Sequence, residues 1–289
     1  MTASVLVLGR GKVGTAIARG VRRARTSVKT VSVRAFLESP RWPMPRRSST
    51  PPLVVIAARD ALVEPVAVVL AKLLREALHR PQRAVVLHVA GALGTAPLAS
   101  LASLGVATGV AHPLVSILEG APQDALRGAA LVATGDARAL AAARSLARSL
   151  SMRFVAPRAL EPAAYHAAAA LLANGAVALA SVSEALLVRA GLAPTDVASL
   201  LAPLLRSVAG NLGRFGVQPA LTGPIRRGDS ATVARHLGVL RTSQFASDLG
   251  LYVASGRVQL RLSRDLGEAS AQDLTRIEEL LNLANAAPP

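Results

Sequence analysis

Cysteine is absent from the 289 residues, and aromatic side chains make up only 2% of them. The first absence excludes disulfide bridges and thiolate metal sites, and it favours a cytoplasmic protein. The second excludes the aromatic stacking platform that single-stranded nucleic-acid binding requires. Lysine is also scarce and occurs only at Lys12, Lys29 and Lys72. Arginine therefore carries nearly all of the positive charge.

The charge balance is strongly positive, with a formal net charge of +16 at pH 7. Such a balance ordinarily indicates a polyanionic partner such as nucleic acid. Here the arginines are spread along the chain, with one concentration from Arg22 to Arg47. The excess of Arg and Ala is typical of the codon bias of a GC-rich genome. We therefore expect a small-molecule ligand and no nucleic-acid partner.

No signal peptide is expected, because the first few residues lead directly into an apolar strand. Two long uncharged stretches have the length of a membrane span. Ala84 to Leu118 is interrupted by glycines and prolines, and Pro162 to Ser183 is rich in alanine and carries Tyr165 and Asn174. We expect neither to span a membrane, and we expect the second to be a helix buried in protein.

The hydrophobic content of 52% is enough for a large core, and its pattern changes near residue 157. Before this point, short runs of Val, Leu and Ala alternate with helical stretches, which is the pattern of βαβ units and a parallel sheet. After it, helical periodicity alone follows. The sequence predicts a Rossmann-type, mostly parallel α/β domain over residues 1–157 and an all-α domain over residues 158–289.

The expected strands are residues 4–8, 30–34, 53–57, 84–89, 106–111, 130–134 and 153–156, and the main helices between them are residues 13–25, 62–79 and 137–150. Further helices are expected over residues 162–190, 194–215, 230–255 and 271–286. Asp60 and Asp136 stand at expected N-caps, and Gly191 at an expected C-cap. The stretch from Leu37 to Pro52, rich in Pro, Ser and Arg, is expected to be an irregular surface loop.

Gly9, Gly11 and Gly14 form the pattern GxGxxG directly after an apolar strand and at the start of a helix. This is the context of a dinucleotide-binding fingerprint. The first glycine permits a tight turn, the second lets the backbone approach a pyrophosphate, and the third lets the helix pack on the strand. The alternative is a glycine-rich turn without a ligand. The predicted cofactor-binding residues are Gly9, Arg10, Gly11, Lys12, Val13, Gly14, Arg34, Ala58 and Ala90.

Arg34 stands twenty residues after Gly14, where an NAD-binding protein is expected to place an acidic residue on the ribose 2′-hydroxyl. An arginine there can instead pair with the 2′-phosphate of NADP(H). Arg41, Arg46 and Arg47 are further candidates in the following loop. We therefore predict NADP(H) in preference to NAD(H); the alternative is that Arg34 is one more arginine of an arginine-rich chain.

Residues 4–157 resemble the N-terminal domains of pyrroline-5-carboxylate reductases, ketopantoate reductases and β-hydroxyacid dehydrogenases, which also have a helical domain after the Rossmann domain. Four segments are more specific and resemble the Rossmann-like proteins that carry the domain of unknown function 2520. This resemblance covers nearly the whole chain and implies the fold and the cofactor class, without an assigned substrate. Some ketopantoate reductases of an alternative type are similar to these proteins, which makes that reaction a candidate. The four segments are HVAGALG (88–94), AHPL (111–114), YHAAAALLAN (165–174) and ALTGPIRRGD with VARHL (220–237).

One position departs from the families of similar fold. β-Hydroxyacid dehydrogenases and ordinary ketopantoate reductases bring a lysine, four residues before an asparagine, to the substrate carbonyl. Asn174 has Ala170 at that position. The lysine is missing, and a dinucleotide-binding protein without catalysis, such as a redox sensor or an assembly subunit, is therefore an alternative function.

His166 and Asn174 lie eight residues apart on one expected helix, hence on nearly the same face. Hydride transfer to a carbonyl or imine leaves negative charge on the heteroatom and requires a hydrogen-bond or proton donor about 3 Å away. We predict His166 as the acid and Asn174 as the group that orients the substrate, with His112 at the carboxyl edge of the sheet as a third catalytic candidate. The alternatives are a core or dimer-interface role for His166 and a tight-turn role for His112.

Thr222, Arg226 and Asp229 belong to a turn that enters a helix and are predicted to contact a substrate carboxylate, the usual partner of a guanidinium. An N-cap role is the alternative for Asp229. No pair of histidines has metal-ligand spacing, so no metal is expected. The sequence thus predicts a cytoplasmic, NADP(H)-dependent oxidoreductase for a small carbonyl or imine acid, with a homodimer formed through helix 162–190.

Overall fold

The structure, a computed structural model, describes residues 4–44, 52–78, 80–242 and 244–286. The chain divides into a first unit, Met1–Gly175, and a second unit, Ala176–Pro289. This division falls inside helix α6 (Pro162–Arg189), whereas the sequence places a boundary at residue 157. The assignment of separate roles to residues 1–157 and 158–289 stays a prediction.

The first unit contains a seven-stranded sheet in the order β2-β1-β3-β4-β5-β6-β7. All neighbouring strands are parallel except β5 and β6. Strands β2 and β3 flank β1 on opposite sides, so the carboxyl end of β1 is a topological switch point, where open α/β folds bind ligands. The strands are β1 (Val5–Leu8), β2 (Val28–Val31), β3 (Leu53–Ile56), β4 (Val85–His88), β5 (Ala107–Leu114), β6 (Ala130–Gly135) and β7 (Arg153–Val155).

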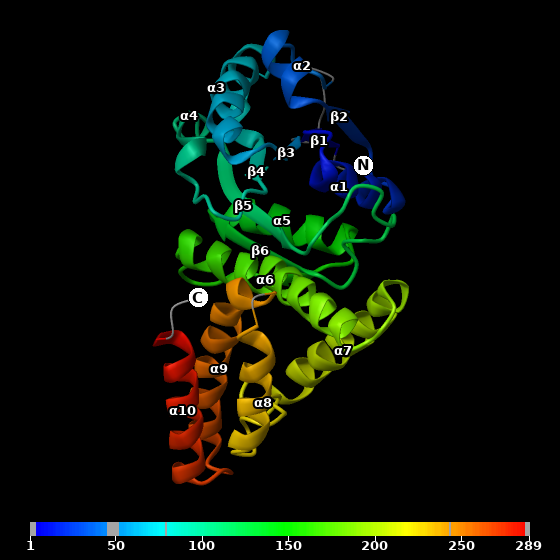
Figure 1. Cartoon of the computed structure of the whole chain (residues 1–289). Helices are drawn as coiled ribbons and strands as arrows, with labels where there is room; N and C mark the ends of the chain where they lie inside the picture. Colours follow the sequence, from blue (N-terminus) through cyan, green and yellow to red (C-terminus); the bar gives the residue numbers. More distant parts are fainter. Residues whose placement is uncertain (1–3, 45–51, 79, 243, 287–289) are drawn as a thin grey trace. The chain divides into compact units, whose positions relative to one another are not determined.

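Helices cover both faces of this sheet (Figure 1). Side chains alternate along each strand, so Val5 and Val7 pack in one core while Leu6 and Leu8 pack in the other. Burial on both faces explains why the strands are continuous hydrophobic runs, and it confirms the Rossmann-type α/β fold expected from the sequence. The first face is covered by α1 (Lys12–Arg23) and α5 (Ala137–Ser149). The other face is covered by α2 (Val33–Glu38), α3 (Asp60–Ala77) and α4 (Ala99–Ala102). The connecting loops contain two short 3-10 turns, η1 (Pro81–Arg83) and η2 (Ala96–Leu98).

Two of the expected helix caps have different outcomes. Asp136 caps α5 as predicted, because its carboxylate accepts a hydrogen bond from the backbone N–H of Ala139 at 2.9 Å. The prediction for Asp60 is wrong by one residue: Arg59 is the N-cap of α3, and Asp60 lies in the first turn. A carboxylate in the first turn still interacts favourably with the helix dipole, which accounts for the acidic residue at this position.

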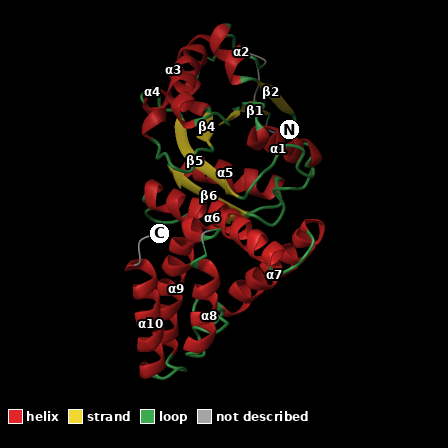
Figure 2. Ribbon diagram, viewed as in Figure 1, coloured by secondary structure: helices red, strands yellow, loops and turns green. Residues whose placement is uncertain are grey.

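The described part of the second unit consists of helices joined by loops (Figure 2). It contains the end of α6, followed by α7 (Pro194–Phe215), α8 (Ser230–Leu240), α9 (Ala246–Leu266) and α10 (Ala271–Ala286). Side chains such as Val233 of α8, Leu260 of α9 and Ile277 of α10 form a common core. The unit is therefore a helical one, as the sequence predicts.

The prediction of a single helix over residues 230–255 is wrong. The chain forms two helices there, α8 and α9, with a turn between them. The Thr242 hydroxyl donates a hydrogen bond to the Val239 carbonyl at 2.8 Å, which satisfies a carbonyl at the end of α8. Phe245 is the N-cap residue of α9 and is 1% exposed. Burial of this ring and the hydroxyl cap stabilise a turn that helical periodicity does not reveal.

Helix α6 is more exposed than its sequence predicts. None of its 28 residues is buried. The next helix, α7, is similarly exposed, because Val197 is its one buried residue among those described. Leu171 and Leu172 are 78% and 70% exposed. By length and composition α6 would also suffice to cross a membrane. The expectation of a buried helix is therefore wrong for the single chain, because an apolar composition does not specify what covers a helix.

Candidate functional site

The loop after β1 brings the backbone close to its neighbours at two of the three fingerprint glycines. Gly9 has a φ of 141°, and a side chain there would overlap the carbonyl oxygen of Ala57. A side chain at Gly14 would overlap the carbonyl oxygen of Gly9. In contrast, a Cβ at Gly11 would meet no atom within 4 Å. The fold therefore requires Gly9 and Gly14, whereas Gly11 keeps open space beside the start of α1.

The start of α1 is free to bind an anion. Gly11 is the N-cap, no side chain caps the helix, and the first turn contains no acidic residue. The first N–H groups of a helix lack backbone partners and carry the positive end of the helix dipole. Lys12 adds a positive side chain at this end. The arrangement fits the pyrophosphate of a dinucleotide, whose oxygens would accept hydrogen bonds from these N–H groups.

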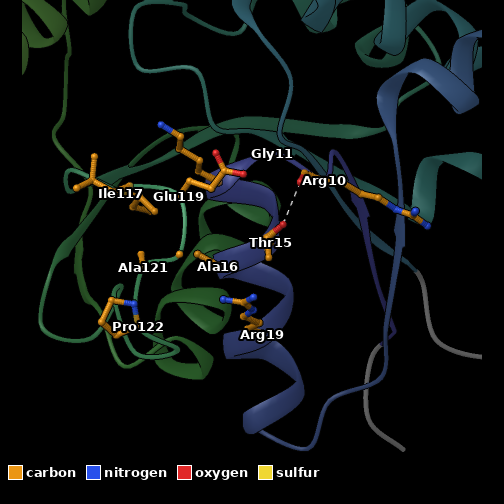
Figure 3. Close-up of a pocket in the computed structure, with 12 residues that line it drawn as sticks. Arg10, Gly11, Thr15, Ala16, Arg19, Ile117, Glu119, Ala121 and Pro122 are labelled. Carbon is orange, nitrogen blue, oxygen red and sulfur yellow. Dashed lines mark hydrogen bonds between the residues drawn. The ribbon is translucent and has the colours of Figure 1, made fainter.

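A pocket of about 390 Å³ lies beside the start of α1. Figure 3 shows Thr15 and Arg19 of the helix on one side and the loop with Glu119 on the other. The Thr15 hydroxyl donates to the Arg10 carbonyl at 3.1 Å, which ties the loop to the helix. The Arg10 side chain points away from the Glu119 loop toward β2, where it donates to the Thr30 carbonyl at 3.4 Å.

A neighbouring groove of about 430 Å³ runs between α1 and β2. Arg10, Arg19 and Arg22 contribute to its lining together with Thr30. Arg10 lines both this groove and the pocket at the helix start. Glu119 is the one acidic residue in the linings of these two spaces, so the surroundings of the α1 N-terminus carry a net positive charge, which favours an anionic cofactor.

Arg34 occupies a different element from the one expected. Strand β2 ends at Val31, and the Ser32 hydroxyl accepts a hydrogen bond from the Ala35 N–H at 3.2 Å, which starts α2. Arg34 therefore lies in the first turn of α2, and its Nε donates to Glu38 Oε1 at 2.7 Å. The arginine side chain is 87% exposed, and such an exposed pair contributes little, so the guanidinium is available to a phosphate.

The other arginines proposed for the 2′-phosphate are placed only in part. Arg41 is exposed and lies in the described part of the loop after α2. Arg46 and Arg47 lie outside the described residues. Of the residues expected to line the cofactor, Ala58 follows the carboxyl end of β3 and Ala90 follows that of β4. Both positions belong to the same sheet edge as the loop after β1.

His88 organises the turn after β4. Its Nδ1 accepts a hydrogen bond from the Ala90 N–H at 3.2 Å, so its proton is assigned to Nε2, which donates to the Gly94 carbonyl at 2.9 Å. The ring is fully buried, and this burial lowers the pKa of His88. His88 is thus a neutral structural histidine that holds residues 90–94 at the edge of the sheet.

A cluster of His112, Tyr165 and His166 lies in the first unit. Strand β5 continues past Val110, the partner of His88 at the end of β4, and this places His112 beyond the carboxyl edge of the parallel strands. Its Nδ1 forms a 2.7 Å hydrogen bond with the Tyr165 hydroxyl. The ring centroids of His112 and His166 are 6.3 Å apart. The structure therefore brings together two of the three predicted catalytic residues and adds a tyrosine.

The environment favours the uncharged forms of two members of this cluster, His112 and Tyr165. Burial lowers the pKa of His112, the neighbouring His166 lowers it further, and Asp60 acts in the opposite direction. Burial raises the pKa of the Tyr165 hydroxyl. A Cβ at Gly91 would lie 2.9 Å from Cδ2 and Nε2 of the His112 ring, so the glycine leaves space for this ring. The result is a phenol beside a neutral imidazole at the edge where α/β folds bind their ligands.

Asn174 lies on α6, eight residues beyond His166, and both side chains are exposed. Eight residues correspond to roughly 12 Å along a helix, and the helical period keeps both residues on nearly the same face. Asn174 is therefore separate from the cluster around His112. Sequence reasoning missed Tyr165; its position next to His166 in the sequence was a signal, but the contact with β5 was not visible there.

The residues predicted to contact a substrate carboxylate lie in the second unit, where two of them have internal partners. Arg226 donates two hydrogen bonds to Glu268, at 2.8 and 2.6 Å, and two more to backbone carbonyls of the preceding turn. Asp229 accepts from the N–H and the hydroxyl of Thr232, which confirms the N-cap alternative. A contact of Thr222, Arg226 or Asp229 with a substrate stays a prediction.

Acidic and histidine side chains do not gather into a metal site in the described ranges: no group of three or more residues that could hold a metal ion occurs there. This finding and the hydrogen bonds above leave the edge of the first unit's sheet as the candidate site. Its chemically capable groups are the open helix start at Gly11, the cation Arg10, and the cluster of His112, Tyr165 and His166.

Comparison with known proteins identifies one domain. A family model described as domain of unknown function DUF2520 matches residues 129–257, so the chain contains this domain. The matched residues include the end of the first unit and the larger part of the second. A search of the curated proteins finds no match.

Three solved structures relate the fold to known ones. The "putative NADP oxidoreductase BF3122" from Bacteroides fragilis is 17% identical, with a TM-score of 0.62 over 92% of this chain and 98% of its own. Protein TM1727 from Thermotoga maritima is 21% identical, with a TM-score of 0.62 over 90% and 98%. A reductive aminase from Aspergillus terreus, in complex with NADPH and ethyl-5-oxohexanoate, is 18% identical, with a TM-score of 0.54 over 99% and 94%. At these identities the likeness establishes the fold alone.

Proposed function

We propose that the protein is a cytoplasmic, NADP(H)-dependent oxidoreductase that acts on a carbonyl or imine group of a small acid. The observation that carries the proposal is the sheet edge of the first unit, where an open, uncapped helix start after β1 and a His–Tyr–His cluster after β5 occur together. The structural neighbours named as an NADP oxidoreductase and as an NADPH-bound reductive aminase support this choice among the ligands of Rossmann folds.

The cofactor fits the residues present. The backbone from Gly9 to Val13 would hold the pyrophosphate, because the space at Gly11 is one that a Cβ would fill. Arg34 and Arg10 would face the adenosine end, where a 2′-phosphate distinguishes NADP(H) from NAD(H). Ala58 and Ala90 would line the cofactor at the ends of β3 and β4. When bound, the nicotinamide supplies hydride chemistry, and the protein supplies position and electrostatics.

The proposed catalytic groups are those that can stabilise charge on the heteroatom of the substrate. His112 and His166 lie within one cluster, and Asn174 of the same helix would orient the substrate. Thr222, Arg226 and Asp229 remain the proposed contacts for a substrate carboxylate. Because Arg226 already pairs with Glu268, binding through its guanidinium would require exchange of this carboxylate for that of the substrate.

The cofactor proposal is tested by titrating the full chain with NADPH and, separately, with NADH. We expect NADPH to bind well below millimolar concentration and more tightly than NADH. If neither binds below millimolar concentration, the proposed function is wrong. If NADPH binds but no reduction of small 2-oxo acids or cyclic imine acids follows, the dinucleotide-binding protein without catalysis, which the missing lysine left open, is the better description.

We also propose that α6 and α7 are covered by a second copy of the chain. Exposure of many apolar side chains on these helices is unfavourable in water, and surfaces rich in exposed apolar groups ordinarily mark an interface. Light scattering after size exclusion, in buffer without detergent, should give about twice the 29.7 kDa of one chain. A monomer would contradict the proposal, and a chain soluble only in detergent would favour a membrane role for α6 instead. The exposed side chains are Leu171, Leu172, Val177, Leu179, Val188, Leu200, Leu204, Leu205, Val208 and Phe215.

A further inference from the structure

The chain has two tyrosines, and each forms a hydrogen bond with a histidine Nδ1. Tyr165 bonds to His112 at 2.7 Å, with ring centroids 5.5 Å apart and planes at 89°. Tyr252 of α9 bonds to His236 of α8 at 2.9 Å, with centroids 6.0 Å apart and planes at 89°. The two pairs have nearly the same geometry, so any difference in their behaviour must come from their surroundings.

The surroundings differ in the way that a catalytic role requires. His112 lies at the carboxyl edge of the sheet, as does the loop after β1, whereas His236 is an exposed residue of a helix in the second unit. Burial raises the pKa of both tyrosines, so burial of the hydroxyl does not separate the pairs. The position relative to the candidate cofactor site does separate them.

We propose that Tyr165 is the proton donor of the reduction and that His112 is the positioning residue that holds its hydroxyl. This inference rests on the proposed function, in which a reduced nicotinamide is the reductant. It assigns to Tyr165 the acid role that sequence reasoning gave to His166, and it changes the role of His112 from direct contact with the substrate to action through the phenol.

The hydrogen-bond directions follow from the partners available to His112. Nδ1 of His112 forms a hydrogen bond with the Tyr165 oxygen. Nε2 faces Gly91 and forms no hydrogen bond with any of the described residues. A neutral imidazole carries one N–H group. The favoured tautomer is the one in which this N–H group donates a hydrogen bond to an available acceptor. With the proton on Nδ1, His112 donates to the phenol oxygen. The phenol hydrogen is then free to point toward a substrate.

The proton balance of the step is complete. The carbon of the C=O or C=N group gains a hydride, for which the bound reduced nicotinamide would be the donor and would itself become oxidised. The π electrons of that group move to the heteroatom. The Tyr165 O–H bond breaks and a bond between this hydrogen and the heteroatom forms. The Nδ1–H of His112 stabilises the phenolate that remains, and the phenolate regains a proton from water. The transfer is favourable because an alkoxide, formed from C=O, and a nitrogen anion, formed from C=N, are both much stronger bases than a phenolate.

The first experiment follows the ionisation of Tyr165 without any substrate. In Tyr252→Phe, Tyr165 is the one remaining tyrosine, so phenolate absorbance reports it alone. The titratable groups around it are His112 of β5 and His166 of its own helix, with Asp60 of α3 acting on His112. NADP⁺, whose nicotinamide is positively charged, should lower the midpoint by roughly one pH unit relative to NADPH, because a nearby cation favours the phenolate. His112→Phe in the same background should raise the midpoint, because it removes the donor.

The matched control is Tyr165→Phe, in which the phenolate signal belongs to Tyr252. Its midpoint should be the same with NADP⁺ and NADPH. If NADP⁺ binds but leaves the Tyr165 midpoint unchanged, the inference is wrong while the proposed function stands. If neither nucleotide binds, the proposed function itself fails. Nitrogen NMR of the imidazole rings checks the tautomer near neutral pH: a proton on Nε2 of His112 would overturn the assigned orientation.

Turnover provides a second readout, with NADPH and either pyruvate or a cyclic imine acid as probes. Tyr165→Phe should lower kcat by about 10²- to 10⁴-fold, the usual contribution of a general acid, with little change in KM or in NADPH affinity. Tyr252→Phe should leave all of these quantities unchanged. Equal turnover of Tyr165→Phe and the parent would refute the role of the phenol, and a loss confined to His166→Ala would assign the acid role to that histidine.

Discussion

Substitution of the three fingerprint glycines by alanine separates what the fold requires from what a ligand requires. Gly9 and Gly14 lack space for a side chain because carbonyl oxygens of Ala57 and Gly9 occupy it, whereas Gly11 faces open space. We therefore expect Gly9→Ala and Gly14→Ala to destabilise the protein. Gly11→Ala should fold normally and bind NADPH poorly.

The magnitudes follow from the local geometry. At Gly9, a φ of 141° costs a non-glycine residue about 1–3 kcal/mol. Displacement of the Ala57 carbonyl adds an overpacking cost of about 1–3 kcal/mol. Together these remove a large part of the ~5–15 kcal/mol by which domains are stable. At Gly11, φ is −69°, which alanine adopts freely. The poorer N-cap and the reduced entropy of the unfolded chain oppose each other, so stability should stay within ~0.5 kcal/mol of the parent.

The effect of Gly11→Ala on binding comes from the added methyl group, which would take the space of a phosphate oxygen. Loss of one hydrogen bond to a charged group costs about 1.5–3 kcal/mol, which corresponds to roughly tenfold to a hundredfold weaker NADPH binding. Urea unfolding measures the stability and calorimetric titration the affinity. The reasoning is refuted if Gly11→Ala destabilises the protein as much as Gly9→Ala, or if it binds NADPH as tightly as the parent.

Further predictions concern the adenosine end, the buried histidines and a helix cap. Arg34→Ala should weaken NADPH about tenfold or more and leave NADH unchanged; an unchanged ratio of the two affinities would show that Arg34 does not face the 2′-phosphate. Burial lowers the pKa of His88 and of His112 in the folded protein below the ordinary value of 6.5. At a pH below 6.5 the unfolded chain therefore binds more protons than the folded protein, and the free energy of unfolding should fall as the pH drops through 6.5. His88→Gln should flatten this profile, and a profile that His88→Gln leaves unchanged would contradict the assignment. Asp136→Ala should cost ~0.5–2 kcal/mol in urea unfolding, because it removes the cap of α5, whereas Asp60→Ala should cost less; equal losses would contradict the cap geometry.

The strands and the glycine loop after β1 could be predicted because their signals are local. Strands such as Val5–Leu8 are buried on both faces, and this burial makes them continuous apolar runs. The glycine pattern gained its meaning from the strand before it and the helix after it. Both kinds of signal are complete within about twenty residues of sequence.

The features that were missed depend on single side chains or on distant partners. Ser32 is the N-cap of α2 and follows directly after β2. Arg34 therefore lies in a helix and not in the strand that the sequence predicts. Thr242 and Phe245 divide an expected helix into α8 and α9. Periodicity averages over several residues and does not report such local hydrogen bonds or one buried ring.

Tyr165 is the most informative omission. Its relevance depends on a hydrogen bond to His112, which is 53 residues earlier in the chain. The exposure of α6 was missed for a related reason, since a sequence states that a helix is apolar but not which surface covers it. The sequence thus predicted the close backbone approaches at Gly9 and Gly14 but not the contact of Tyr165 with His112, and the roles of these residues in binding and catalysis stay predictions.

Determination of the structure with NADP⁺ bound tests the central claim most directly, because one experiment locates both ends of the cofactor. We expect the pyrophosphate over the backbone of Gly9 to Val13 and the nicotinamide on the side of Ala90, with the Tyr165 hydroxyl facing the space beside its ring. A cofactor bound elsewhere on the protein, or a nicotinamide remote from the cluster of His112, Tyr165 and His166, would contradict the account.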